Sequence, residues 1–94
     1  MTKFLIERRF HVGEKDMPEV SRKSKRLTIE EFPEITWEHS HVVVDDAGTV
    51  KTFCVYEAPS EDIVRAHAAA LGVHDVEGIY EIAGDVTPDD FPLD

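Results

Sequence analysis

The sequence contains little cysteine and few basic residues. Its 94 residues include one cysteine, one tryptophan and ten lysines and arginines, against twenty acidic residues, which gives a net charge of −10. A single cysteine excludes an intramolecular disulfide framework and fits a reducing cytoplasm. The negative charge argues against nucleic acids and anionic membranes as partners, because lysine and arginine supply most of the affinity for phosphate groups. The charge is compatible with the attraction of cations.

Long apolar runs and several well-known motifs are also absent from the sequence. No stretch approaches the roughly 20 apolar residues of a membrane span, and the first ten residues do not resemble a signal peptide. The sequence has no CxxC or HExxH motif and no glycine-rich phosphate loop. We therefore expect one small soluble domain over residues 1–94, with its core over about 1–86 and an acidic tail over 87–94.

The apolar pattern predicts the element order β-α-β-β-α-β. Asp16 and Glu19 have the spacing of a capping box, and Gly72 is suited to end a helix. Together with the alternating segments, these signals predict strands over residues 3–11, 35–45, 49–57 and 76–86, and helices after Asp16 and Ser60. This order is typical of an α+β, ferredoxin-like βαββαβ fold, in which a four-stranded antiparallel sheet carries two helices on one face.

The other face of such a sheet would have no helix to cover it. The strands after residue 35 nevertheless carry apolar residues in both registers, whereas a sheet with one face in water should alternate more cleanly. We therefore expect a second copy of the chain to cover this face, so that the protein is a homodimer.

Two histidines stand in the second expected strand. His39 and His41 are two residues apart, so they share a face with Trp37 and Val43. Two imidazoles at this spacing can chelate one metal ion.

The single cysteine, Cys54, lies on the hairpin partner of that strand, and its face depends on the turn. A two-residue loop would place Cys54 opposite His39 and Tyr56 opposite Trp37. A three-residue loop with a bulge would place Val55 opposite His39 and send Cys54 to the other face. The sequence leaves both arrangements open.

A third histidine, His67, lies in the second expected helix. Helical spacing puts it in the middle of an apolar face, so it should point at the sheet. There it would be a metal ligand or a general base, or a core histidine bonded to a backbone carbonyl or to Tyr56. Histidine and thiolate suit Ni²⁺, Zn²⁺ and Cu²⁺ rather than Ca²⁺ or Mg²⁺. The candidate metal ligands are therefore His39, His41, Cys54 and His67.

Several of these segments resemble a family of small bacterial ferredoxin-like proteins of unassigned physiological role, which includes a nickel-binding, nickel-responsive homodimer. The resemblance rests on Phe-Leu-Ile-Glu-Arg at 4–8, Trp-Glu-His-Ser-His-Val at 37–42, Lys-Thr-Phe-Cys-Val-Tyr-Glu-Ala-Pro at 51–59, His67-Ala68 and Gly72. It implies the same fold, a homodimer and nickel as the metal. Two departures from the family stand out: His41 replaces the usual tyrosine, which would add a ligand or alter the site, and His74 stands near a position where proline is common.

The leading hypothesis is a non-enzymatic, cytoplasmic homodimer that binds a divalent transition metal, nickel by resemblance, with zinc and copper as alternatives. A second hypothesis is a cofactor-free dimeric enzyme of the oxygenase or isomerase type. In that enzyme Trp37 and Tyr56 would line a pocket between sheet and helices, with His39 or His67 as general base. A third is an interaction module whose core histidines are structural.

Overall fold

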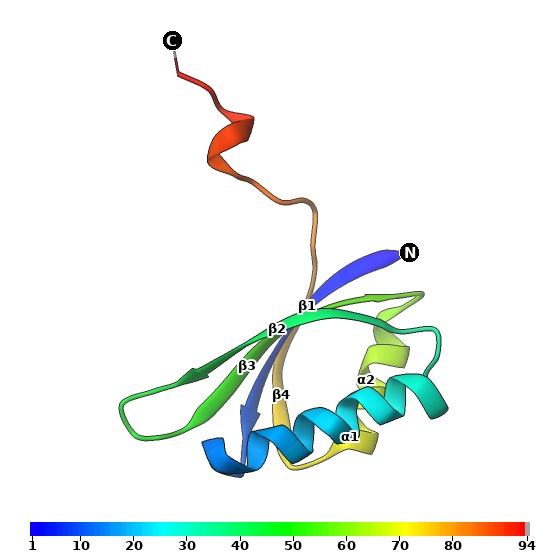
Figure 1. Ribbon diagram of the computed structural model, residues 1–94. Helices are drawn as coiled ribbons and strands as arrows, with labels where there is room; N and C mark the ends of the chain where they lie inside the picture. The colour runs from blue at the N-terminus through cyan, green and yellow to red at the C-terminus, as the bar shows by residue number, and fades with distance from the viewer. Residues whose placement is uncertain (94) are drawn as a thin grey trace.

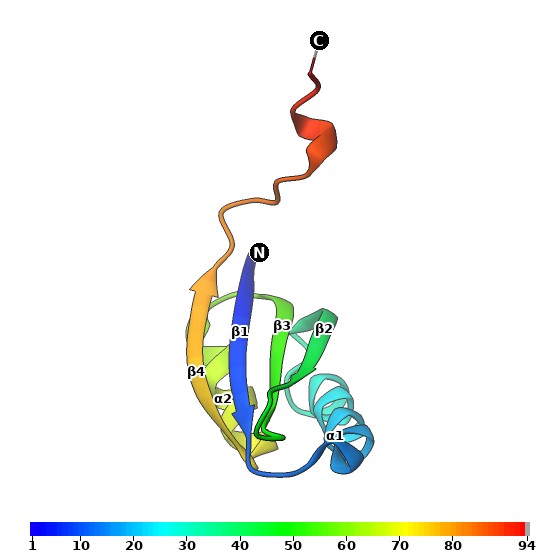
Figure 2. The ribbon, with the colours of Figure 1, turned by 90° about the vertical axis from the view of Figure 1, so that its left-hand side faces the viewer.

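The computed structural model describes residues 1–93, which form one four-stranded sheet and two α-helices. The strands are β1 (Thr2–Phe10), β2 (Thr36–Val44), β3 (Val50–Ala58) and β4 (His74–Glu81), and the helices are α1 (Met17–Glu30) and α2 (Glu61–Leu71). Neighbouring strands are antiparallel, in the order β2-β3-β1-β4. Both helices lie on the same side of the sheet (Figure 1 and Figure 2). The ferredoxin-like βαββαβ prediction is confirmed.

The core lies between the sheet and the helices. Alternate residues of β1 and β3 point at the helices, so Phe4, Ile6, Tyr56 and Ala58 are buried there, together with Val64 of α2. The intervening residues of these strands face the other side of the sheet and are only half-buried or exposed. The two faces of the sheet therefore offer different environments to any functional side chain.

The start of α1 differs from the sequence prediction. The Asp16 carboxylate accepts a hydrogen bond from the Gly13 backbone N–H at 3.1 Å, and it makes no capping bond to α1. Glu19 pairs with Arg22 instead of completing a capping box. The predicted capping box was wrong because a short 3-10 turn, Glu14–Asp16, precedes α1 and uses the Asp16 side chain.

The turn between β2 and β3 determines the register of the hairpin. Asp45 Oδ1 accepts hydrogen bonds from the backbone N–H groups of Ala47 at 3.0 Å and Thr49 at 2.9 Å. Gly48 closes the turn with φ of 83°, a left-handed conformation that glycine adopts at little cost. The last strand pair before the turn is Val44 with Val50.

The predicted limits of the last strand, 76–86, were wrong, because β4 begins at His74 and ends at Glu81. Gly72 and Val73 both have positive φ, at 70° and 56°, so the chain reverses within two residues of α2. The Val73 carbonyl then accepts a bond from the His11 N–H at 2.8 Å, and pairing with β1 starts at once.

The chain after β4 leaves the sheet because β1 offers no further partner. Ile82 donates to the Lys3 carbonyl at 2.9 Å, and the following residues extend away from the sheet, with one 3-10 turn at Pro88–Asp90 (Figure 1). The expected acidic tail, 87–94, ends at Asp94, which lies outside the described residues. None of the helices formed by residues 1–93 has the length and apolar character needed to cross a membrane.

Candidate functional site

The hairpin register places His39 and His41 on the face of the sheet that carries no helix. His39 lies opposite Val55 and His41 opposite Phe53. Both histidines are exposed, and their ring centroids are 5.4 Å apart. Neither imidazole has a hydrogen-bond partner among the described residues, so both rings keep a nitrogen lone pair free for a metal ion.

The surroundings of this histidine pair are apolar toward the middle of the sheet. Leu5, Phe53 and Val55 lie beside the histidines in the central strands and are only half-buried. Tyr80 of β4 pairs with Leu5 on the same face and is 53 % exposed. An apolar stripe of four side chains therefore lies next to the His39–His41 pair.

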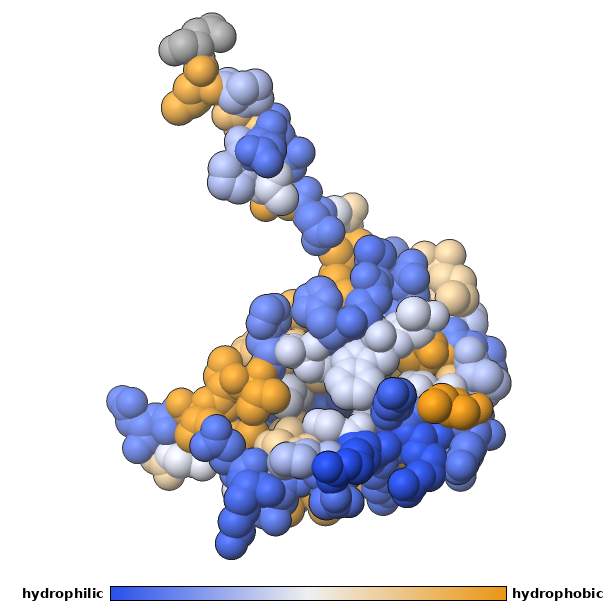
Figure 3. Space-filling view, viewed as in Figure 1, coloured by the Kyte–Doolittle hydropathy of each residue, from blue (hydrophilic) through white to orange (hydrophobic). Residues whose placement is uncertain are grey.

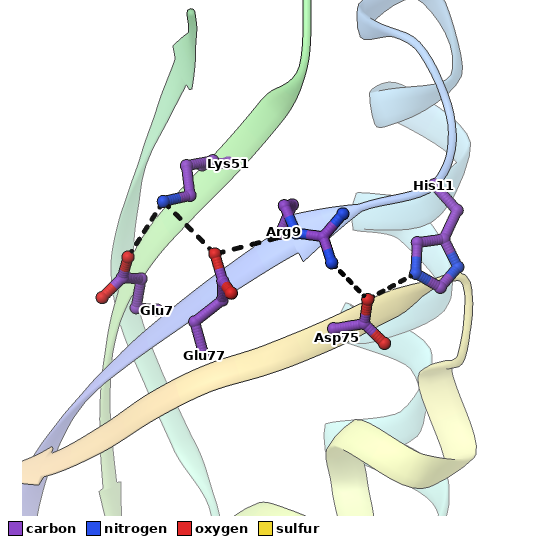
Figure 4. Close-up of polar contacts among 6 residues, drawn as sticks. All are labelled: Glu7, Arg9, His11, Lys51, Asp75 and Glu77. Atoms are coloured by element: carbon purple, nitrogen blue, oxygen red, sulfur yellow. Dashed lines mark hydrogen bonds and ion pairs between the residues drawn. The ribbon is translucent and has the colours of Figure 1, made fainter.

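Charged residues occupy the part of this face toward the β1–α1 connection (Figure 4). Lys51 Nζ lies 3.1 Å from Glu7 Oε2 and 3.3 Å from Glu77 Oε1. Arg9 continues the row, with Nη2 2.9 Å from Asp75 and Nε 3.8 Å from Glu77. Each of these carboxylates already faces a cation, which makes the row a poor metal site.

His11 stands at the end of that row. Its Nε2 lies 2.9 Å from Asp75 Oδ2, and this hydrogen bond is the main reason that the pKa of Asp75 is lowered. His74, at the start of β4, has Nδ1 2.6 Å from the Gly72 carbonyl and packs against Phe10. Both histidines therefore have partners of their own, away from His39 and His41.

A bulge moves Trp37 away from the two histidines. Trp37 lies opposite Tyr56, whereas His39 lies opposite Val55, so Glu38 is an extra residue in β2. Trp37 consequently packs against the core under the helices. The expectation that Trp37 shares a face with His39 and His41 was wrong, because simple alternation along the strand does not hold across the bulge.

Cys54 lies on the helix-covered face, as the three-residue-loop alternative requires. It pairs with Ser40, is 3 % exposed, and contacts the Thr52 hydroxyl at 3.4 Å and Arg8 Nη1 at 3.6 Å through its sulfur. The sheet itself separates this thiol from His39 and His41.

His67 is also on the helix-covered side and is completely buried. Its Nε2 lies 3.3 Å from the Ser24 carbonyl of α1 and 3.4 Å from the Ser24 hydroxyl. The ring packs edge-on against Tyr56 and Phe32, at centroid distances of 5.5 Å and 5.8 Å. This is the environment of a core histidine that joins the two helices.

Burial lowers the pKa of His67 to about 4, since a charged imidazole would lose its water there. The hydrogen bond to the Ser24 carbonyl opposes this shift, and the nearby charge of Arg8 adds to it. His67 is therefore neutral at pH 7, with Nε2 donating to Ser24.

The four candidate ligands thus form two separate groups. His39 and His41 lie on the open face, and Cys54 and His67 lie beneath the helices. No cluster of three or more histidine, cysteine, aspartate or glutamate side chains within residues 1–93 has the geometry to hold a metal ion. One copy of the chain supplies a two-histidine half-site.

A cavity lies between α1 and the sheet. Its wall includes both aromatic residues expected to line a pocket, Trp37 and Tyr56. It also includes Arg8, which is only 2 % exposed and donates to the Tyr56 hydroxyl at 3.1 Å. The sequence reasoning did not select Arg8, although it alternates with Phe4, Ile6 and Phe10 along β1 and so shares their buried face.

Comparison with known proteins identifies the family. The model of the family described as "Nickel responsive protein SCO4226-like" matches residues 4–82. A search of curated proteins found no match. Among solved structures, the crystal structure of SCO4226 from Streptomyces coelicolor A3(2) is similar, with a TM-score of 0.64 and 18 % identity over 89 % of this chain and 99 % of that one. At that identity the structural match supports the fold alone. The family match covers most of the sequence, and the chain belongs to the SCO4226-like family of nickel responsive proteins.

Proposed function

We propose that this protein binds a divalent transition metal ion, nickel in the first instance, through His39 and His41. The family to which the chain belongs is named for nickel responsiveness. Neutral imidazole is a good ligand for Ni²⁺, and also for Zn²⁺ and Cu²⁺. A single free thiol fits a reducing compartment, so we place this function in the cytoplasm.

The observation that carries the proposal is the arrangement of the two histidines. They are neighbours on one face of β2, with ring centroids 5.4 Å apart, and both are exposed. A modest rotation of each side chain lets both nitrogens approach one ion. His67 and Cys54 are left out of this site because they are buried on the opposite face of the sheet.

Two ligands are too few for a stable protein metal site, which normally has three or four protein ligands. We propose that a second copy of the chain supplies the other half. In a two-fold symmetric dimer the same face meets itself, so two histidine pairs would surround one ion. The apolar stripe of Leu5, Phe53, Val55 and Tyr80 beside the histidines supports this arrangement, because an association of two copies would bury it.

The cavity beneath α1 does not favour the catalytic alternative. Neither His39 nor His67 is among its lining residues, so neither expected general base reaches the space that a substrate would occupy. We therefore propose binding rather than catalysis.

The test is calorimetric titration of the untagged protein with Ni²⁺, Zn²⁺ and Cu²⁺. His39→Ala and His41→Ala should each weaken Ni²⁺ binding by about tenfold or more, since each removes half of the pair. His11→Ala is the matched control: it removes another exposed histidine and should leave the affinity unchanged. Equal Ni²⁺ affinities for the wild type and both β2 variants would contradict the site.

The role of the second copy has a separate test. The wild type should bind one Ni²⁺ ion per two chains. Val55→Lys puts a charge into the apolar stripe, so it should be a monomer in sedimentation equilibrium. It should also bind Ni²⁺ more weakly and lose the stoichiometry of one ion per two chains. Ile29→Lys is its control, because Ile29 is 65 % exposed on α1, away from that face. A wild-type monomer that binds one ion per chain would refute the shared site and leave the histidine pair as the whole protein contribution.

A further inference from the structure

An open groove of about 380 Å³ lies between α1 and the end of α2. Its apolar residues are Val20, Leu71 and Val73, of which Leu71 is buried and Val73 is 45 % exposed. The charged residues that line it are exposed members of α1: Glu19, Arg22, Lys23 and Arg26. This α1–α2 groove therefore has an apolar floor and a mainly basic edge.

The basic edge of the groove is only partly neutralised by the chain itself. Glu19 pairs with Arg22, and Lys23 donates to the Leu71 carbonyl at 3.1 Å, which is a neutral acceptor. Arg26 forms no ion pair within residues 1–93. Figure 3 shows strongly hydrophilic side chains over much of α1. A chain whose net charge is −10 thus keeps a local positive surface beside an apolar groove.

The segment that follows β4 has the complementary character. Val86, Phe91 and Leu93 are 78 %, 64 % and 96 % exposed. Asp89 and Asp90 stand between these apolar residues, and residues 83–93 include no lysine or arginine. Apolar and hydrophilic side chains lie together in solvent along this segment (Figure 3). Such a segment gains apolar burial if it docks on another surface, and its charge selects a basic one.

We propose that residues 85–93 of one copy dock in the α1–α2 groove of a second copy of the chain. Phe91 would cover the apolar floor, and Asp89 would face Arg26. Neither of these two charged side chains has an ion-pair partner within residues 1–93. A guanidinium matches the two oxygens of a carboxylate with parallel N–H groups. The groove lies on the helix side of the molecule, so an association through the open face of the sheet leaves it accessible.

The length of the chain favours a second copy over the groove of the same copy. Val73 lines the groove just before β4 begins, whereas the segment leaves from the other end of that strand (Figure 1). The strand spans about 25 Å at about 3.3 Å per residue. The residues from Ile82 to Phe91 reach about 30 Å when fully extended. Docking within one copy would therefore use almost all of this length and would unwind the 3-10 turn at Pro88–Asp90.

Disulfide trapping between two separately prepared chains tests the contact. One chain carries Val73→Cys in the groove, the other carries Leu93→Cys, and they are mixed in equal amounts in EDTA with oxidised glutathione. We expect the mixed cross-linked dimer, identified by its mass, in several times the yield given by Val44→Cys with the same partner. Val44→Cys is the matched control, because both valines are 45 % exposed. The native Cys54 is 3 % exposed and so does not compete.

A charge exchange tests whether Arg26 and Asp89 meet. Arg26→Glu in the groove chain should lower the cross-link yield by about fivefold, because it replaces an attraction at the surface by a repulsion. Asp89→Lys in the other chain should then restore most of the yield. Lys15→Glu reverses another exposed charge, outside the groove, and should leave the yield unchanged.

The wild type supplies a second readout that does not depend on any variant. The backbone amide resonances of Val73 and Phe91 should shift together in ¹H–¹⁵N spectra as the protein is diluted in EDTA. Equal cross-link yields for Val73→Cys and Val44→Cys, or no shift of these two resonances with concentration, would overturn the proposal. A chain with both Val73→Cys and Leu93→Cys that closes its disulfide within one copy, and not between copies, would overturn the second copy as the occupant.

Discussion

His67 should make the stability of this protein sensitive to acid in a defined pH window. In the folded chain its imidazole is fully buried between α1 and α2, and its pKa is lowered to about 4. In the unfolded chain a histidine has a pKa of about 6.5. Between these two values the unfolded state binds a proton that the folded state does not, so the free energy of unfolding must fall as the pH falls from 6.5 to 4.

The size of this effect follows from the two pKa values. Protonation of His67 in the unfolded chain lowers the free energy of unfolding by about 2 kcal/mol at pH 5. At pH 4 and below this loss approaches about 3 kcal/mol. This is a large fraction of the 5–15 kcal/mol that is typical of a folded domain. Above about pH 7 the imidazole is neutral in both states and the contribution vanishes.

The assay is urea unfolding at pH 7.5 and pH 5, in EDTA and at one protein concentration, for the wild type and His67→Gln. Glutamine does not titrate and can still donate to the Ser24 carbonyl, so the variant should lose about 2 kcal/mol less than the wild type on acidification. His41→Gln removes an exposed imidazole and serves as the control, with the same loss as the wild type. If His67→Gln and the wild type lose equal stability between the two pH values, His67 is not a buried neutral histidine and the reasoning fails.

Two further predictions concern the fold. Gly48→Ala should lower the free energy of unfolding, measured in urea, by about 1 kcal/mol, because alanine is strained at φ of 83°. Gly84→Ala is the control, since Gly84 lies outside the strands with nothing near its Cβ position, and it should change the free energy of unfolding little. Equal values for the two variants would contradict the role of the turn. Ile6→Ala should lower the free energy of unfolding by about 2–5 kcal/mol, because Ile6 is completely buried in the core. Ile29→Ala, at a position that is 65 % exposed, should leave the free energy of unfolding nearly unchanged.

The sequence alone determined the fold. The alternation in β1 and β3, the helical stripe of α2 and the glycine that ends it were enough to predict βαββαβ, because these signals depend on residues close together in the chain. The limits of β4 were wrong, because the strand begins where the neighbouring β1 can first pair with it, and that neighbour is distant in sequence.

The faces on which the candidate residues lie were decided only by the tertiary structure. The turn that contains Gly48 sets the register in which His39 lies opposite Val55, and the bulge at Glu38 shifts that register by one position, so that Trp37 lies on the opposite face. Cys54 and Trp37 therefore lie beneath the helices, while His39 stays on the open face. Arg8 shows the same limit: it alternates with Phe4, Ile6 and Phe10 along β1, but only the packing of β3 and α1 around it shows that its side chain is buried beside neutral groups such as Tyr56. Local patterns fix which elements form, and the contacts between distant elements fix which side chains meet.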